Sequence, residues 1–336
     1  MNMPDALTLQ PIDPEIITRG DATIALGPDV DRYVQGLVDA GLRNVYFVGA
    51  GGSLICSFPA HYLLQRSSEL PVFQLQSDEL NCQPPAAMGP GSLVVLASYT
   101  GTTKETVAAA RTAKATGATV IAAAKDATPL AEAADRSFPG KSDLFELMVA
   151  YAILRATGKL ADPDPEAVTA SLRALPQALT AAVREADDRL AAIAEACKDE
   201  PITYVLGSGP NQAWAYGFAM CYLQEMQWKH AAGFNAGEFF QGAFEVVNDD
   251  VPVILWLGED ASRPMAERAQ AFLEKYCAKA HFVDTVGLEL PGVAAELRPD
   301  VTPLLISTLA SRLAQHYEAA RNHDLKQRRY MFEVEY

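Results

Sequence analysis

Short apolar runs that end in glycine-rich or hydroxyl-rich turns are the strongest constraint on how this chain can fold. The first run, residues 44–48 (NVYFV), precedes the turn GAGGS and a segment of helical periodicity that begins at Leu54. Two further runs, 93–97 and 119–124, flank an alanine-rich helical stretch. Because all three runs are nearly all apolar, both faces of each predicted strand must be covered, as in a parallel sheet between layers of helices. The sequence therefore predicts an α/β protein.

The same order of elements occurs twice along the chain. The run 202–206 with its turn GSGPN corresponds to the run 44–48 with GAGGS, and the runs 251–257 and 281–283 correspond to the second and third strands. Two tandem copies of one α/β unit are the simplest explanation.

Prolines indicate where several segments begin and end. Three prolines in the first twenty residues predict an extended lead-in, and a helix is expected to start after Pro28 and to end near Ala40. The segment ADPDP at 161–165 separates the two halves. A long helical stretch is predicted from there to about Lys198, with an interruption near Pro176.

Charge and cysteine content narrow the class of protein. Asp and Glu number 42 against 27 Lys and Arg, and a net charge of −15 disfavours binding to nucleic acid or to anionic membranes. The sequence has no secretory leader pattern and no apolar run of about 18 residues that could span a membrane. Its five cysteines lack metal-ligand spacing, so we expect reduced, mostly buried thiols, no metal and a cytoplasmic protein.

Two neighbouring turns of the first half carry the residues that an anion site needs. Ser53 follows the first strand, and Ser98, Thr100 and Thr103 follow the second. The amino ends of the following helices offer free N–H groups and a positive dipole end, so these turns predict an anion site, and the number of hydroxyls favours a phosphate over a carboxylate as its ligand. The alternative is that the hydroxyls only cap helices. The corresponding second-half turn, Gly-Glu-Asp at 258–260, is acidic, so one anion site per chain is expected.

Glu225 lies in an otherwise apolar and aromatic helical segment. Such surroundings desolvate a carboxylate and raise its pKa toward the range of a general base. A surface position or an ion pair is the alternative interpretation. Structural roles are the simpler explanation for His230 and His323, and Glu238 could instead be a carboxylate at the start of a helix.

Four segments, together with the doubled unit, resemble a known family. They are the turns GAGGS and SYTGTT, the segment YLQEM at 222–226 and the stretch GEFFQGAFEVV at 237–247. The chain resembles the sugar isomerase (SIS) domain family over nearly its whole length. Its ending, RRYM at 328–331 followed by VEY, resembles the fructoselysine 6-phosphate deglycase branch, which is also similar to the isomerase half of glucosamine-6-phosphate synthase.

This resemblance implies a fold and a domain organisation. It implies two tandem SIS domains, each with a flavodoxin-like parallel sheet flanked by helices. The domains expected from it are an N-terminal extension over 1–27, a phosphate-binding SIS domain over 28–165, a second SIS domain with the catalytic glutamate over 166–322, and a tail over the active site at 323–336.

The resemblance also implies residue roles. Glu225 is the implied acid and base for proton transfer at C1 and C2 of the sugar. The implied phosphate and substrate contacts are Gly51, Gly52, Ser53, Ser98, Tyr99, Thr100, Thr103, Glu238 and Arg329. The family has a histidine sixteen positions after the glutamate, where this chain has Gln241, which cannot transfer a proton near neutral pH. Either another group such as His230 or His323 takes that role, or the substrate needs less help, or catalysis has been lost.

The leading hypothesis is an enzyme that deglycates a fructosamine 6-phosphate to an aldose phosphate and an amine. It requires no metal or organic cofactor. The implied assembly is a homodimer with its site at the subunit interface. The alternatives are an amino-sugar phosphate isomerase or deaminase, and a non-catalytic sugar-phosphate sensor.

Overall fold

The chain divides into two compact units in the computed structural model, which describes residues 7–160 and 164–335. The first unit comprises Glu15–Pro176 and Gly292–Asp300. The second comprises Gln177–Pro291, the chain from Val301 onward and the described residues before Glu15. One point of this division, between Pro176 and Gln177, falls inside helix α9 (Pro165–Cys197). The sequence placed the domain boundary at the first residue of that helix. The expected domain limits stay a prediction.

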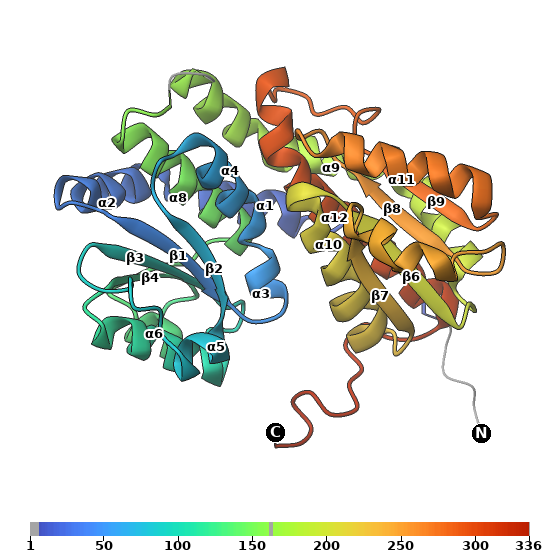
Figure 1. The fold of residues 1–336 in the computed structure, drawn as a ribbon, viewed down its shortest axis with the longest axis horizontal. Helices are drawn as coiled ribbons and strands as arrows, with labels where there is room; N and C mark the ends of the chain where they lie inside the picture. The colour runs from blue at the N-terminus through green and yellow to red at the C-terminus, as the bar shows by residue number, and fades with distance from the viewer. Residues whose placement is uncertain (1–6, 161–163, 336) are drawn as a thin grey trace. The chain divides into compact units, whose positions relative to one another are not determined.

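A five-stranded parallel sheet forms the centre of the first unit, in the order β2-β1-β3-β4-β5 (Figure 1). Its strands are β1 (Asn44–Gly49), β2 (Val72–Gln76), β3 (Ser92–Ala97), β4 (Thr119–Ala123) and β5 (Arg136–Phe138). This is the flavodoxin-like order, in which ligands bind at the carboxyl ends of the strands. β1 and β3 are fully buried, as their apolar runs predict.

Helices cover both faces of this sheet. The helices of the unit, besides α9, are α1 (Glu15–Ile24), α2 (Gly27–Asp39), α3 (Gly52–Ile55), α4 (Phe58–Ser67), α5 (Ser77–Cys82), α6 (Lys104–Ala115), α7 (Pro129–Ala133), α8 (Ser142–Ala156) and the short η5 (Ala295–Leu297). α5, α6 and α7 pack on the face that carries Tyr46, Val94 and Val120. α2, α4 and α8 lie on the opposite side, as Figure 1 shows. Both faces of the sheet are thus shielded from water, which fits strands without polar alternation.

The second unit repeats this plan with four parallel strands in the order β7-β6-β8-β9. The strands are β6 (Ile202–Gly207), β7 (His230–Asn235), β8 (Val253–Leu257) and β9 (Ala280–Asp284). Its helices are η1 (Gly209–Asn211), α10 (Gln212–Gly217), η2 (Phe218–Met226), η3 (Glu238–Gln241), η4 (Ala243–Val246), α11 (Arg263–Tyr276) and α12 (Arg298–Arg321). β6, β8 and β9 occupy the places of β1, β3 and β4, so the predicted doubling of one α/β unit is confirmed.

Two expectations about proline segments are wrong. The lead-in is not extended over its first twenty residues, because α1 begins at Glu15, directly after Pro14. Proline is well tolerated immediately before a helix, where no N–H donor is needed. α9 also continues through Pro176 without interruption. The pyrrolidine ring fits against Gly20 of α1, where an added Cβ would lie 2.6 Å from the Cγ of Pro176.

The cysteines are less buried than expected. Cys197 and Cys277 are buried, but Cys82 is exposed, and Cys56 and Cys221 are intermediate. None of the helices within the described ranges is long and apolar enough to cross a membrane.

Glu146 is an exception to the apolar interior of the first unit. It lies on α8, whose residues from Asp143 to Leu154 are all buried, and it is 0% exposed. Neither of its carboxyl oxygens has a hydrogen-bond partner within residues 7–160 and 164–335. Burial, and then the nearby Asp143, raise the pKa of Glu146 well above its usual value, so the group is held neutral.

Glu146→Gln is therefore expected to stabilise the protein, and more so at higher pH. A carboxyl whose pKa is raised in the folded state lowers the free energy of unfolding once the pH exceeds its unfolded pKa. The amide cannot ionise, so it removes that pH-dependent penalty, and the gain in the free energy of unfolding should grow between about pH 5 and about pH 8. Thermal unfolding at about pH 5 and about pH 8 measures it. Glu132→Gln, at an exposed glutamate of α7, is the control, and an equal effect of Glu146→Gln at both pH values would contradict the expectation.

Candidate functional site

The hydroxyl residues of the first unit meet at the carboxyl edge of its sheet. β1 and β3 pair in parallel with Val48 opposite Leu96, so the turns that follow the two strands are neighbours. In the first turn, Gly51 has a φ of 53° and directly precedes α3, whose first turn contains Gly52 and Ser53. The predicted residues of both turns therefore belong to one edge of one sheet.

The turn after β3 is built around Ser98. Its side chain is 2% exposed, and its Oγ accepts a hydrogen bond from the N–H of Gly101 at 3.1 Å. The same Oγ lies 3.1 Å from the Oγ1 of Thr103, the residue before α6. Thr100 accepts a hydrogen bond from the hydroxyl of Thr102 at 2.8 Å. Thr103 makes no side-chain capping bond to α6, so helix capping does not account for its hydroxyl.

Two cations lie beside this turn, and sequence reasoning missed both. The ring of Tyr99 is 60% exposed. The guanidinium carbon of Arg19 on α1 lies 5.0 Å from the ring centroid, and the Nζ of Lys125 lies 5.1 Å from it. Lys125 follows β4, and β4 pairs with β3, so the end of β4 lies beside the turn that contains Tyr99. The order of strands in the sheet causes this contact, and the spacing of residues along the chain does not predict it. The turn thus combines hydroxyls, free helix N–H groups and positive charge.

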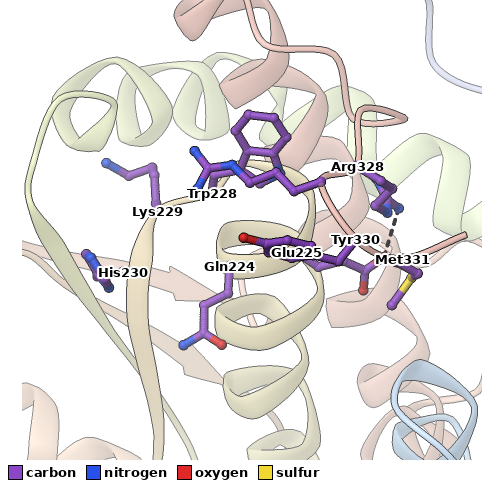
Figure 2. Close-up of a pocket in the computed structure, with 9 residues that line it drawn as sticks. Gln224, Glu225, Trp228, Lys229, His230, Arg328, Tyr330 and Met331 are labelled. Atoms are coloured by element: carbon purple, nitrogen blue, oxygen red, sulfur yellow. Dashed lines mark ion pairs between the residues drawn. The ribbon is translucent and has the colours of Figure 1, made fainter. Parts of the chain in front are cut away.

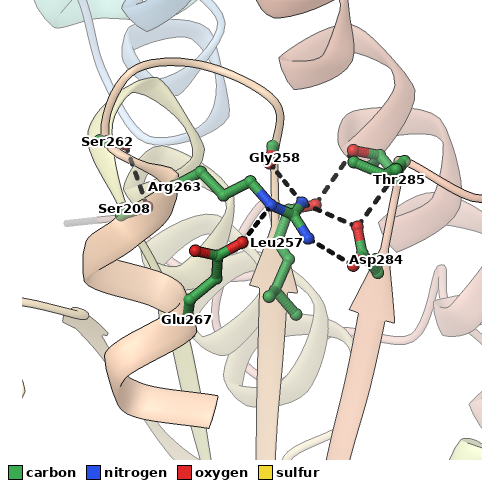
Figure 3. A network of polar contacts seen from close by, with 9 residues as sticks. Ser208, Leu257, Gly258, Ser262, Arg263, Glu267, Asp284 and Thr285 are labelled. Carbon is green, nitrogen blue, oxygen red and sulfur yellow. Dashed lines mark hydrogen bonds and ion pairs between the residues drawn. The ribbon is translucent and has the colours of Figure 1, made fainter. Parts of the chain in front are cut away.

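The corresponding edge of the second unit is filled by its own side chains (Figure 3). Arg263, at the start of α11, donates two hydrogen bonds to Asp284 at 2.9 and 2.7 Å and a third to the carbonyl of Gly258 at 2.9 Å. Although burial opposes it, the hydrogen bond from Arg263 lowers the pKa of Asp284. The hydroxyl of Ser262 also donates to Ser208 at 3.0 Å. These contacts support the expectation of one anion site per chain.

Glu225 lies on a π-helix, η2, that spans nine residues. π-Helices are rare and occur frequently at functional sites. The side chain of Glu225 is 23% exposed and lies in the wall of a pocket of ≈ 640 Å³. Burial raises the pKa of its carboxyl, while the charge and hydrogen bond of Arg328 oppose that rise. The sequence predicted the elevated pKa, and the ion pair that it gave as the alternative is also present.

The C-terminal tail forms one side of this pocket (Figure 2). Arg328 contacts Glu225 with 2.8 Å between Nη2 and Oε1. The guanidinium carbon of Arg329 lies 4.1 Å from the ring centroid of Trp228. The residues that line the pocket are Gln224, Glu225, Trp228, Lys229, His230, Arg328, Arg329, Tyr330 and Met331. Sequence reasoning singled out Glu225, His230 and Arg329 but missed Arg328 and Trp228. The two adjacent arginines at 328 and 329 are the sequence signal that could have suggested a cationic wall.

His323 contacts the pocket residue Trp228 but is not itself among the residues that line the pocket. Its ring packs edge-on against Trp228 at 4.6 Å, and its Nε2 is buried with no hydrogen-bond partner among the residues described. Burial, assisted by the charges of Arg321 and Arg329, lowers the pKa of His323, so the ring is neutral at physiological pH.

Glu238 and Gln241 are not among the residues that line the pocket. Both are exposed and belong to η3, which follows β7. Glu238 occupies the first turn of this short helix. No cluster of His, Cys, Asp and Glu within the described ranges could hold a metal ion. The structure therefore groups the predicted residues into the hydroxyl edge of the first unit, the Glu225 pocket of the second and the exposed η3.

Comparison with known proteins decides the family. Residues 39–139 match the SIS domain family. Fructosamine deglycase FrlB of Bacillus subtilis (strain 168) is 32% identical over 327 residues, which cover 94% of this chain and 99% of the relative. The chain belongs to the SIS domain family.

Further relatives of this SIS protein agree in sequence and in fold. Fructoselysine 6-phosphate deglycase of Escherichia coli (strain K12) is 26% identical over 309 residues, 90% of this chain and 89% of the relative. The crystal structure of a candidate phosphosugar isomerase from Bacillus subtilis superposes with a TM-score of 0.86 at 31% identity, covering 94% of this chain and 99% of that one. The predicted family, its deglycase branch and the fold of two flanked parallel sheets are confirmed.

Gly101→Ala is expected to distort the Ser98 turn and to destabilise the protein. Gly101 has a φ of 67°, and an added Cβ would collide with the side chain of Thr128. Left-handed backbone costs alanine about 1–2 kcal/mol, and the collision adds to that cost.

Gly158→Ala is the matched control for this substitution. Gly158 has a φ of 68°, but nothing lies within 4 Å of its added Cβ, so only the backbone cost applies. Chemical denaturation of both variants measures the difference. An equal decrease in the free energy of unfolding for both variants would show that the side chain of Thr128 moves aside and that the turn accommodates the methyl group.

Proposed function

We propose that this SIS protein deglycates fructosamine 6-phosphates, releasing an aldose 6-phosphate and a free amine. The observation that carries the proposal is the Glu225 pocket, in which Glu225 is the one acid among the described lining residues. A desolvated carboxylate beside cationic and aromatic groups suits the abstraction of a proton next to a carbonyl. The similarity to proteins named as fructosamine and fructoselysine 6-phosphate deglycases supports the same choice.

The reaction proceeds by two proton transfers and a hydrolysis. Glu225 removes a proton from C1 of the open-chain ketosamine, and the electrons of that bond form a C1–C2 double bond as the carbonyl oxygen at C2 takes up a proton. Protonation at C2 then draws the nitrogen lone pair into an imine at C1. Water adds to C1, the C1–N bond breaks, and the amine leaves with a proton. The sum is one ketosamine phosphate plus one water, giving one aldose phosphate plus one amine.

The hydroxyl edge of the first unit binds the phosphate in this proposal. Ser53, Ser98, Thr100 and Thr103 supply hydroxyl donors, and the twelve-residue helix α6 supplies N–H groups and a positive dipole end. Arg19 and Lys125 add the charge that favours a phosphate over a neutral hydroxymethyl group.

Gln241 and Glu238 have a different place in the proposal. They are exposed on η3, so we assign them to a subunit interface, where they would reach the site of a second copy in a homodimer. His323 is neutral, half-buried and packed against Trp228, which favours His230, in the pocket lining, for any help with ring opening. The homodimer and the cytoplasmic location stay predictions.

The purified protein is expected to release glucose 6-phosphate and amine from one or more members of a panel of fructosamine 6-phosphates. Glu225→Gln should lower turnover by at least about a hundredfold, because the amide cannot accept the C1 proton. A coupled dehydrogenase assay measures the sugar phosphate. Glu274→Gln, at an exposed glutamate of α11, is the matched control and should retain full turnover.

Ligand binding separates this function from the alternatives. Thermal unfolding should show stabilisation by phosphorylated sugars and none by the unphosphorylated forms, since a ligand that binds the folded state raises the melting temperature. Full turnover by the Glu225 variant would remove that residue from the mechanism. Stabilisation without turnover across the whole panel would favour an isomerase of another amino sugar or a sugar-phosphate sensor.

A further inference from the structure

Arg328 is held in a fixed position at the Glu225 pocket. Its Nη2 lies 2.8 Å from Oε1 of Glu225, and its Nη1 donates to the backbone carbonyls of Leu325 at 2.7 Å and Gln327 at 3.0 Å. Its side chain is 14% exposed. Backbone carbonyls of the tail therefore hold the guanidinium of Arg328 next to the carboxylate of Glu225. The pair is thus an ordered, largely buried ion pair and not a contact between two mobile surface charges.

The other two cationic side chains that line the pocket, Lys229 and Arg329, contact groups other than Glu225. The Nζ of Lys229 donates to the carbonyls of Lys198 and Glu200 at 3.0 and 2.6 Å. Arg329 lies over the ring of Trp228.

Among the described residues, the remaining titratable groups of this region make no ion pair with the carboxylate of Glu225. His230 is exposed at the start of β7, and the ring of Tyr330 is 68% exposed. Neutral His323 faces Trp228. Among the described residues, Arg328 is thus the cation that pairs with Glu225.

The surroundings of Glu225 make this cation important. The carboxylate emerges from a helical segment with buried Phe218, Ala219 and Leu223, and burial favours its protonated form. A protonated carboxyl cannot accept a proton from the substrate. A fixed guanidinium compensates for the lost hydration and, through a single directed hydrogen bond, leaves the second carboxylate oxygen available for the reaction.

We propose that Arg328 is a positioning residue, which keeps the carboxylate of Glu225 ionised and orients it for proton abstraction. The role of Glu225 as base rests on the proposed function, whereas the coupling between the two side chains does not. Arg328 itself transfers no proton, because guanidinium stays charged throughout the working pH range.

The test compares three tail variants across pH. Arg328→Gln removes the charge, Arg328→Lys retains it, and Lys326→Gln removes an exposed charge two residues away as the matched control. At neutral pH, kcat of Arg328→Gln should fall about tenfold to a hundredfold, the usual cost of a misplaced or unavailable base, with a smaller change in KM.

The pH profile distinguishes positioning from a merely structural role. In Arg328→Gln, burial of Glu225 is no longer opposed, so the acid limb of kcat/KM should move to higher pH and activity should partly recover in alkaline buffer. Arg328→Lys should restore the limb toward its original position, and Lys326→Gln should leave it unchanged. A uniform loss at every pH, with the limb in place, would overturn the proposal.

A titration without substrate keeps the two proposals separate. Carbon-13 NMR of labelled glutamate carboxyls follows Glu225 directly, with its signal assigned by its absence in Glu225→Gln. The midpoint should move to higher pH in Arg328→Gln even if no fructosamine phosphate is turned over, in which case only the deglycase function is refuted. An unchanged midpoint in a folded variant, checked by circular dichroism, would refute the role of Arg328.

Discussion

Parallel strand pairing is the constraint on which the rest of this structure depends. A parallel pair requires a crossover through a helix, so every strand ends at the same edge of its sheet and every following helix begins there. In the first unit this rule places the turn after β1 beside the turn after β3. In the second it does the same for β6 and β8, with Leu206 opposite Leu255. Because the backbone already brings the turns together, a binding site at such an edge requires only suitable side chains in the turns.

The two units use the same edge in opposite ways. In the first, the hydroxyls of Ser98 and Thr103 bond, within the described part of the chain, only to each other and to the local backbone, and cations lie nearby. In the second, the bidentate contact of Arg263 with Asp284 satisfies the polar groups internally. A guanidinium that is paired with a carboxylate has few free hydrogen-bond donors, and its charge is already neutralised, so it binds a further anion poorly. The functional difference between the two copies thus resides in side chains, while the order of strands is shared.

The sequence predicted those parts of the fold and site that depend on local composition. β1, β3, β4, β6, β8 and β9 were predicted from short, nearly continuous apolar runs. β7 was not, because it contains Gly233, whose added Cβ would lie 2.5 Å from the carbonyl oxygen of Ala215 on α10. The close approach of a helix thus requires a residue that weakens the strand pattern. Glu225 stood out among apolar neighbours, but its contact with Arg328 depends on the path of the tail, which no local pattern encodes.

The π-helical turn beneath Glu225 links the register of the backbone to the direction of the carboxylate. A π-helix hydrogen-bonds from each residue to the fifth along rather than the fourth, so it accommodates an additional residue compared with an α-helix. Loss of one residue from Phe218–Met226 would let the segment relax to α-helical geometry, with about 100° between successive side chains, and would change the direction in which the carboxylate of Glu225 points. The length of this segment is therefore as much a part of the site as the identity of its glutamate, and insertions or deletions should be tolerated less here than in the exposed loops.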